Sequence, residues 1–143
     1  MGLLELARKA PQVGPGVSVA HAVSAMVEAR VGALAVMDGP KIAGVFTERD
    51  LMRRVVEPGK DPHTTVLRDV MTSPVITVTG EMSVATAAAL MRKHHVRHLA
   101  IVDAQGDYLG MLALRYLLYD ILEDLELKVG DLSNWVMADA RGG

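Results

Sequence analysis

The chain has 143 residues, of which 50% are hydrophobic and 22% are charged, and its formal net charge is −2. This length can bury a core, whereas a nucleic-acid binder would need a strongly basic surface. Because the chain has no Cys, disulfides, thiol nucleophiles and Cys-based zinc sites are excluded. No apolar run reaches the roughly 18 residues of a membrane span, so we expect a cytoplasmic protein that binds neither nucleic acid nor membrane.

The first part of the chain alternates turn signals with short periodic segments. Ser18 is a good N-cap for a helix whose apolar residues recur at helical spacing, and Gly32 is expected to end it. Two apolar runs flank the turn at 38–41 and read as strands. The expected elements are a helical lead-in (1–9), an extended piece at Val13, a helix (18–30), strands at 33–37 and 42–46, and a helix at 48–56.

The pattern returns after a segment rich in Pro and Gly. Residues 58–70 are predicted to be a linker, and Ser83 then provides a second N-cap. The expected elements of this part are strands at 75–78, 96–102 and 108–112, a helix from 83 to about 94, and a helix from 114 into 123–127. Each half therefore reads as strand–helix–strand–strand–helix.

The two halves are copies of one unit. Residues 65 positions apart are identical at Val13/Val78, Ser18/Ser83, Val19/Val84, Ala20/Ala85, Ala22/Ala87, Met26/Met91, Val31/Val96, Leu34/Leu99, Ala35/Ala100 and Asp38/Asp103. One extra residue in the second turn then aligns Gly44 with Gly110 and Leu51 with Leu117. We predict a tandem duplication, with repeats at 10–57 and 71–125 and a tail at 126–143.

This order of elements predicts a mixed α/β (α+β) fold. The runs at 34–36 and 99–102 are apolar on both faces, and a three-stranded sheet with two helices leaves one face uncovered. Two repeats packed sheet to sheet about a pseudo-twofold axis would cover both sheets. The cleft between equivalent strand ends is then a reasonable ligand site.

The stretch Gly44-Val45-Phe46-Thr47-Glu48-Arg49-Asp50 joins a strand to a helix. Thr47 can cap that helix, with Asp50 one turn further on the same side. The hydroxyl, the carboxylate and the free backbone N–H groups also suit a ribose phosphate, because helix starts attract anions. Taken alone, the stretch favours the simpler interpretation, a capping box that binds no ligand.

The repeat resembles the CBS domain, and residues 10–125 are similar to a pair of such domains, a Bateman module. Val96-Arg97-His98-Leu99-Ala100-Ile101-Val102-Asp103 resembles the family's V-R-H-L-P-V-V-D strand. The stretch 44–50 resembles its G-[IV]-[VIF]-[ST]-x-x-D motif, and Met71-Thr72-Ser73-Pro74 resembles the opening of a second repeat. Together, at this spacing, these motifs indicate the family.

The resemblance implies an adenosyl-ligand sensor and no enzyme, with AMP, ADP or ATP as regulatory ligand and no catalytic cofactor. The implied roles are phosphate and ribose contacts for Thr47 and Asp50, an adenine pocket from Thr72, Pro74, Val75, Ile76 and Val96, and phosphate contacts for Arg97 and His98. Arg97 and His98 favour a phosphorylated ligand over S-adenosylmethionine. A homodimer is expected, and the module can also have a regulated protein partner.

The second copy of the site departs from the motif. Ala113 and Tyr116 stand where the first repeat has Thr47 and Asp50, so the diol acceptor and the hydroxyl are missing. The pocket of this second site would come from Ala10, Pro11, Val31 and Gly32, and Arg97 and His98 are replaced there by Gly32 and Ala33. We therefore predict one working site per chain.

Three features have alternative readings. His94, His95 and His98 could suggest a metal site, but the chain passes from helix to strand between them, so we predict none. The methionines at 26, 52, 91 and 111 are interpreted as core residues.

The apolar tail series Leu125, Leu127, Val129, Leu132, Trp135 and Val136 either packs back on the module or forms a dimer or partner surface. A structural or protein-interaction module, with Thr47 and Asp50 only as a cap, is the alternative function.

Overall fold

The computed structural model describes the backbone of residues 2–142 and the side chains of residues 2–131. The elements in chain order are α1 (Leu3–Leu6), β1 (Gln12–Val13), α2 (Val19–Ala29), β2 (Ala33–Asp38), β3 (Lys41–Thr47), α3 (Glu48–Asp50), the π-helix η1 (Leu51–Val56), the 3-10 helix η2 (Leu67–Asp69), β4 (Thr77–Val78), α4 (Val84–His94), β5 (His98–Val102), β6 (Tyr108–Ala113) and α5 (Leu114–Gly142). The mixed α+β class predicted from the sequence is confirmed.

Each half forms a three-stranded sheet of the same design. In the first sheet β1 pairs with β2 in parallel and β2 with β3 antiparallel; in the second, β4, β5 and β6 repeat this arrangement. The predicted strands at 75–78 and 96–102 are shorter in the structure. Even so, the Ile76 carbonyl accepts a hydrogen bond from the Ala100 N–H, so the chain already follows the sheet before β4 begins.

The two long helices of the repeats begin and end alike. The hydroxyls of Ser18 and Ser83 accept hydrogen bonds from the N–H groups three residues later, which confirms both predicted N-caps. Both helices are followed by a left-handed residue, Arg30 and His95, so their ends lie close to the predicted 30 and 94. A left-handed residue lets the chain turn sharply into the next strand.

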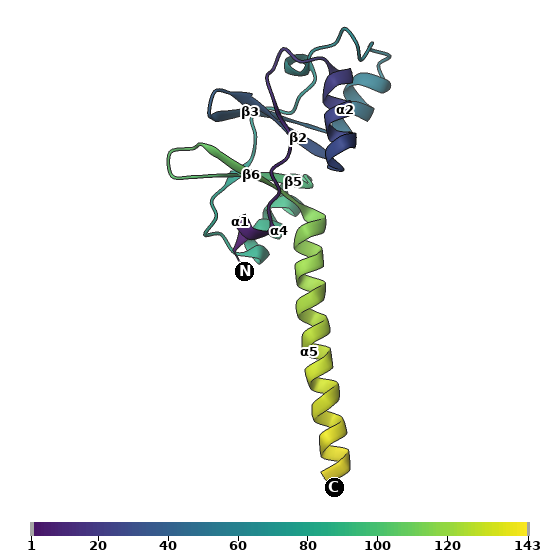
Figure 1. Cartoon of the computed structure of the whole chain (residues 1–143), viewed down its shortest axis with the longest axis vertical. Coiled ribbons are helices and arrows are strands. Elements are labelled where there is room, and N and C mark those ends of the chain that lie inside the picture. The colour runs from purple at the N-terminus through teal and green to yellow at the C-terminus, as the bar shows by residue number, and fades with distance from the viewer. Residues whose placement is uncertain (1, 143) are drawn as a thin grey trace.

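The sheets pack against each other, as the apolar strands required. A layer of buried side chains lies between them, made by Ala10, Ala35, Val45 and Met111. Two larger cores lie on the outer faces, under the helices of each repeat. At one end the two hairpin turns meet, where the Lys41 ammonium contacts the Asp107 carboxylate at 2.6 Å. The predicted sheet-to-sheet arrangement is therefore confirmed, and Figure 1 shows the two sheets stacked.

The segments that precede the repeats cross over. Leu3, in α1, is fully buried in the core of the second repeat, and Arg8 pairs with Met111 of β6. Leu67 and Val70, in the predicted linker, are buried in the core of the first repeat. The predicted helical lead-in is thus only one turn long, and the end of the predicted linker is part of a core.

The core interpretation of the methionines holds for three of the four, and only one of the two alternatives for the tail fits its described part. Met26, Met91 and Met111 are buried, but Met52 is 57% exposed. It lies in η1, whose wider π-helical turn changes which side chains face the core. The tail does not pack back over Leu125, Leu127 and Val129, whose side chains are exposed. The side chains of Leu132, Trp135 and Val136 lie outside the described residues.

The last helix is much longer than predicted. α5 was expected to end near 123–127, but it continues to Gly142 and projects away from the two sheets (Figure 1). Its first turns are anchored, since Leu117 is fully buried in the core of the second repeat. Within the described residues, no helix combines the length and apolar character needed to cross a membrane.

Candidate functional site

The corner at Thr47–Asp50 is a complete capping box. The Thr47 hydroxyl accepts a hydrogen bond from the Asp50 N–H at 3.2 Å, and the Asp50 carboxylate accepts one from the Thr47 N–H at 3.0 Å. The other carboxylate oxygen of Asp50 accepts the hydroxyl hydrogen of Thr72 at 2.8 Å. The structure therefore brings together three of the residues predicted for the site, from both sides of the linker.

Asp50 is the one buried charged residue among the described side chains, with 4% of its surface exposed. Burial of a carboxylate is costly unless hydrogen bonds replace its water. Here the two donors of the corner do so, and the Arg54 Nε atom lies 3.7 Å from the carboxylate. Each carboxylate oxygen retains a free lone pair, so a ligand hydroxyl that reached the corner would find an acceptor.

Close backbone packing holds Thr72 in the corner. Val45 and Thr72 exchange two backbone hydrogen bonds, of 3.0 and 2.8 Å, between β3 and the segment that enters the second repeat. Gly44 makes this approach possible, because a Cβ atom there would lie 2.5 Å from the Met71 sulfur and 3.0 Å from the Thr72 carbonyl oxygen. The glycine of the motif is thus a packing requirement of the corner.

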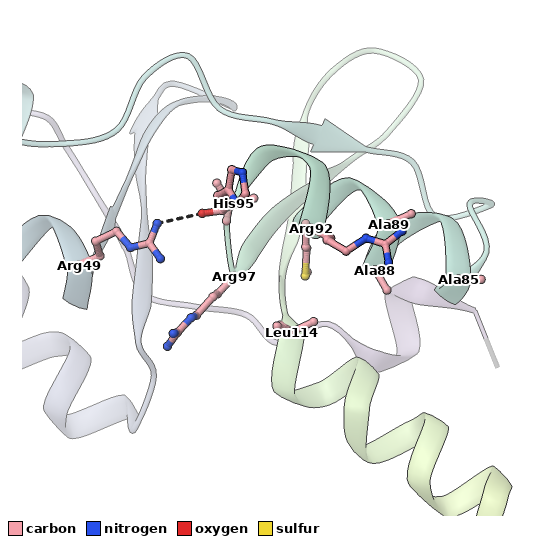
Figure 2. A pocket seen from close by; sticks show the side chains of 10 residues that line it. Arg49, Ala85, Ala88, Ala89, Arg92, His95, Arg97 and Leu114 are labelled. Carbon is pink, nitrogen blue, oxygen red and sulfur yellow. Dashed lines mark hydrogen bonds between the residues drawn. The ribbon is translucent and has the colours of Figure 1, made fainter.

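A cavity of about 580 Å³ lies along α4, and Arg49 is the residue of the first repeat that lines it, whereas Thr47, Asp50 and Thr72 do not (Figure 2). Val96 and Arg97, both predicted site residues, line it together with Arg49 and the small residues of α4. The Arg49 guanidinium donates to the His95 carbonyl at 2.8 Å and so bridges the two repeats. Arg49 was missed in the sequence, although it lies inside the motif between Thr47 and Asp50.

The remaining predicted residues are placed differently. Val75 packs in the layer between the sheets, Ile76 packs against the core of the second repeat, and Pro74 is exposed. His98 lines a second, nearly filled cavity of about 10 Å³. Adjacent residues of an extended chain point to opposite sides, which explains why Arg97 and His98 do not line the same cavity.

The second cavity is the pseudo-symmetric copy of the site. It is lined by residues that the repeat assigned to it, Ala10, Val31, Gly32, Ala113 and Tyr116. Two guanidinium groups occupy the space beside the Tyr116 ring, that of Arg8 at 4.8 Å from the ring centroid and that of Arg115 at 5.1 Å. In place of a carboxylate, the second corner holds an arginine–tyrosine stack.

The three histidines considered as metal ligands do not form one site. His94 ends α4, His95 is the left-handed residue after it, and His98 begins β5 and lines the second cavity. Among the side chains that the structure describes, no three His, Cys, Asp or Glu residues gather in a way that could hold a metal ion.

His98 should make the stability of the protein depend on pH. Burial and, to a smaller extent, the positive charges of Arg115 and Arg97 together lower its pKa from 6.5 to about 4. Between pH 6.5 and 4 the unfolded chain binds a proton at His98, whereas the folded chain does not. The contribution of His98 to the free energy of unfolding is therefore complete above pH 6.5 and is lost as the pH falls toward 4. The expected loss of unfolding free energy is on the order of 3 kcal/mol.

Urea unfolding at a series of pH values between 4 and 7.5 measures the slope of the unfolding free energy against pH. His98→Gln should flatten it, whereas the matched change at the exposed His63 should leave it as in the parent protein. An unchanged slope in His98→Gln would show that other groups cause the acid sensitivity.

The fold and the paired corners define a class of protein built from tandem α+β repeats around an interrepeat cleft. A sequence model of the CBS domain matches residues 5–57 and again residues 67–123. The chain belongs to the CBS domain family, as the motifs had indicated.

Known proteins agree with this assignment. The protein MK0525 of Methanopyrus kandleri is 43% identical over 75 residues, which are 52% of this chain and 38% of that protein. A solved structure of a protein with CBS domains from Burkholderia ambifaria superposes with a TM-score of 0.80 at 30% identity, covering 87% of this chain and 96% of the other. The CBS domain protein PAE2072 of Pyrobaculum aerophilum, solved with AMP, has a TM-score of 0.77 at 26% identity over 90% of this chain and 99% of its own.

The curated relatives include longer proteins. The chain spans 38% of the length of the Methanopyrus protein and 49% of CBSX3 of Arabidopsis thaliana, which is 34% identical over 102 residues.

Proposed function

We propose that the chain is a regulatory module that binds one adenosyl ligand, an adenine nucleotide, in the cleft beside the Thr47–Asp50 corner. The observation that carries this proposal is the asymmetry of the two corners. The first has a buried carboxylate joined to Thr47 and Thr72, and Arg49, which lies between Thr47 and Asp50 in the sequence, lines a cavity of about 580 Å³. In the second, arginines and a tyrosine fill the equivalent place.

The chemistry of the first corner fits a ribose phosphate. The Asp50 carboxylate has acceptor capacity for a sugar hydroxyl, and the start of α3 adds the Thr47 hydroxyl. Arg97, exposed at the cavity, provides a forked donor for a phosphate, and Arg49 adds a second positive charge from the other repeat. The AMP complex of the similar Pyrobaculum protein supports the same class of ligand.

Such a ligand would act by linking the repeats. Arg49 and Thr72 already connect the first corner to the segments at 95–97 and 71–74. A nucleotide held by residues of both repeats favours the arrangement in which they lie close, provided that it binds this arrangement more tightly than a more open one. Homodimerisation belongs to the same proposal, because helices of both repeats leave apolar side chains exposed, among them Val27, Met52 and Leu125.

Thermal melting with AMP, ADP, ATP, S-adenosylmethionine and adenosine tests the proposal. A ligand present at 100 times its dissociation constant stabilises the fold by about 2.7 kcal/mol, which corresponds to a rise in Tm of roughly 8 °C for a domain of this size. The phosphorylated ligands should give the larger shifts. Arg97→Ala should reduce the AMP shift toward that of adenosine, and GMP serves as the control for base recognition. The absence of a shift with every adenosyl compound would reject the proposal.

A structural or protein-interaction module is the second candidate. It is favoured by one observation, namely that the Asp50 carboxylate is already satisfied by two hydrogen bonds without any ligand. In that case no nucleotide would shift the melting temperature, and the corner would serve only to start α3.

A further inference from the structure

The exposed side of α5 carries a heptad repeat. Leu118, Leu122, Leu125 and Val129 follow each other at alternating spacings of four and three residues, and all lie on the described part of the helix. In the sequence the same spacing continues at Leu132 and Val136, whose side chains lie outside the described residues. This alternation places Leu122 and Val129 at a positions and Leu118 and Leu125 at d positions of a coiled coil.

These side chains face no other part of the chain. Leu118 is 46% exposed, Leu122 53%, Leu125 50% and Val129 65%. They are distinct from the anchoring side of α5, where Leu117 is fully buried against the second repeat. Leu122, Leu125 and Val129, with Glu126 and Gly130, also line a shallow groove of about 480 Å³ along the helix.

A helix of this kind needs a partner. An isolated helix gains little stability in water, and most helices are stabilised by packing their apolar side. With 29 residues, α5 is roughly 43 Å long at about 1.5 Å per residue, and it leaves the module after its first turns. Tyr119, Ile121 and Leu127 are exposed outside the stripe, but the regular spacing of the stripe itself has the period that matches a second helix with the same repeat.

We propose that α5 pairs with α5 of a second copy of this chain in a parallel, two-stranded coiled coil. The residue types support this partner, because Leu occupies both described d positions and Val129 one of the two a positions, and Val at a with Leu at d favours two parallel strands. The flanking residues are compatible. In parallel register Ile121 at a g position meets Glu126 of the second copy at an e position, so no like charges face each other. On the same chain Lys128 pairs with Asp124 at 3.3 Å, outside the stripe.

This inference is independent of ligand binding. The stripe begins at Leu118, after the second corner has ended at Tyr116. Two modules would be held side by side at one end of the paired helices, whatever their clefts contain.

The oligomeric state of the full chain tests the proposal. Sedimentation equilibrium at micromolar concentration should give a dimer for the parent protein. Leu125→Glu, which places a charge in the seam, should weaken the dimer at least 100-fold. Leu127→Glu is the matched control, since Leu127 is 64% exposed on the same helix but outside the stripe, and it should leave the dimer intact. The melting temperature of the module reports that both variants are folded.

The direction of the helices can be tested with the same pair of positions. The chain has no Cys, so a single introduced thiol gives an unambiguous crosslink. Leu125→Cys should form a disulfide-linked dimer under mild oxidation, and Leu127→Cys should form far less. A monomeric parent protein, a dimer that Leu125→Glu leaves intact, a trimer, or equal crosslinking at both positions would each overturn the proposal.

Discussion

Asp50→Ala should abolish the stabilisation of the protein by an adenine nucleotide and should also lower the stability of the unliganded fold. The carboxylate accepts hydrogen bonds from the Thr47 N–H at 3.0 Å and the Thr72 hydroxyl at 2.8 Å, and both donors would lose their partner. Leaving partly buried donors unpaired costs about 1–3 kcal/mol. The unliganded Tm should then fall by roughly 3–9 °C, and the nucleotide should no longer raise it.

Two control variants separate the cap from the ligand site. Asp50→Asn keeps the size of the side chain and an acceptor oxygen, so it should recover much of the stability but little of the nucleotide response. Tyr116→Ala alters the equivalent place in the second corner and should leave the nucleotide response intact. If Asp50→Ala were destabilised but still bound nucleotide as tightly as the parent protein, the corner would be a cap and nothing more.

Phe46→Ala should cause the largest loss of stability of any single truncation considered. Phe46 is the only Phe of the chain, is fully buried in the first core, and sits one residue before the corner. Removal of a buried Phe side chain typically costs 3–5 kcal/mol because it leaves a cavity. This is a large part of the 5–15 kcal/mol of a typical domain. Urea unfolding followed by circular dichroism measures the difference.

The duplication provides a matched comparison for this variant. Leu112 occupies the equivalent position in the second repeat and is also fully buried. Leu112→Ala should cost about 2–5 kcal/mol, while leaving the first corner untouched. A loss below about 1 kcal/mol in Phe46→Ala would mean that the first core can collapse around the missing ring, contrary to the close packing of protein interiors.

The fold could be predicted because the same order of helices and strands occurs twice in the sequence. Ser18 and Ser83 cap equivalent helices, and the apolar strands that follow require a cover on both faces, which only a second sheet provides. A repeat also helps to decide whether a short apolar run is a strand or a helix, because each element can be judged from two copies of the sequence. The boundaries were less accurate. The ends of α2 and α4 lie close to the predicted 30 and 94, but α5 continues to Gly142 instead of ending near 123–127, and the predicted linker contains Leu67 and Val70 of the first core.

The site was predicted less completely, for physical reasons that can be named. A motif assigns residues to a site by their order in the sequence. In an extended chain, however, successive side chains face opposite sides, and for this reason His98 lines the second cavity. Arg49 was missed because its role depends on His95, which lies in the other repeat. The exposure of Met52 depends on a π-helical turn, which no spacing rule anticipates.

The crossing of the segments before each repeat has a consequence for the history of the molecule. Each repeat completes its core with apolar residues that belong to the start of the other, Leu3 in one direction and Leu67 with Val70 in the reverse. A single ancestral repeat would have needed a second copy to supply this segment, as in reciprocal exchange between subunits. In a chain with two repeats the exchange is intramolecular, and the effective concentration of the exchanged segment is in the millimolar range. A chain with an odd number of such repeats would leave one core open.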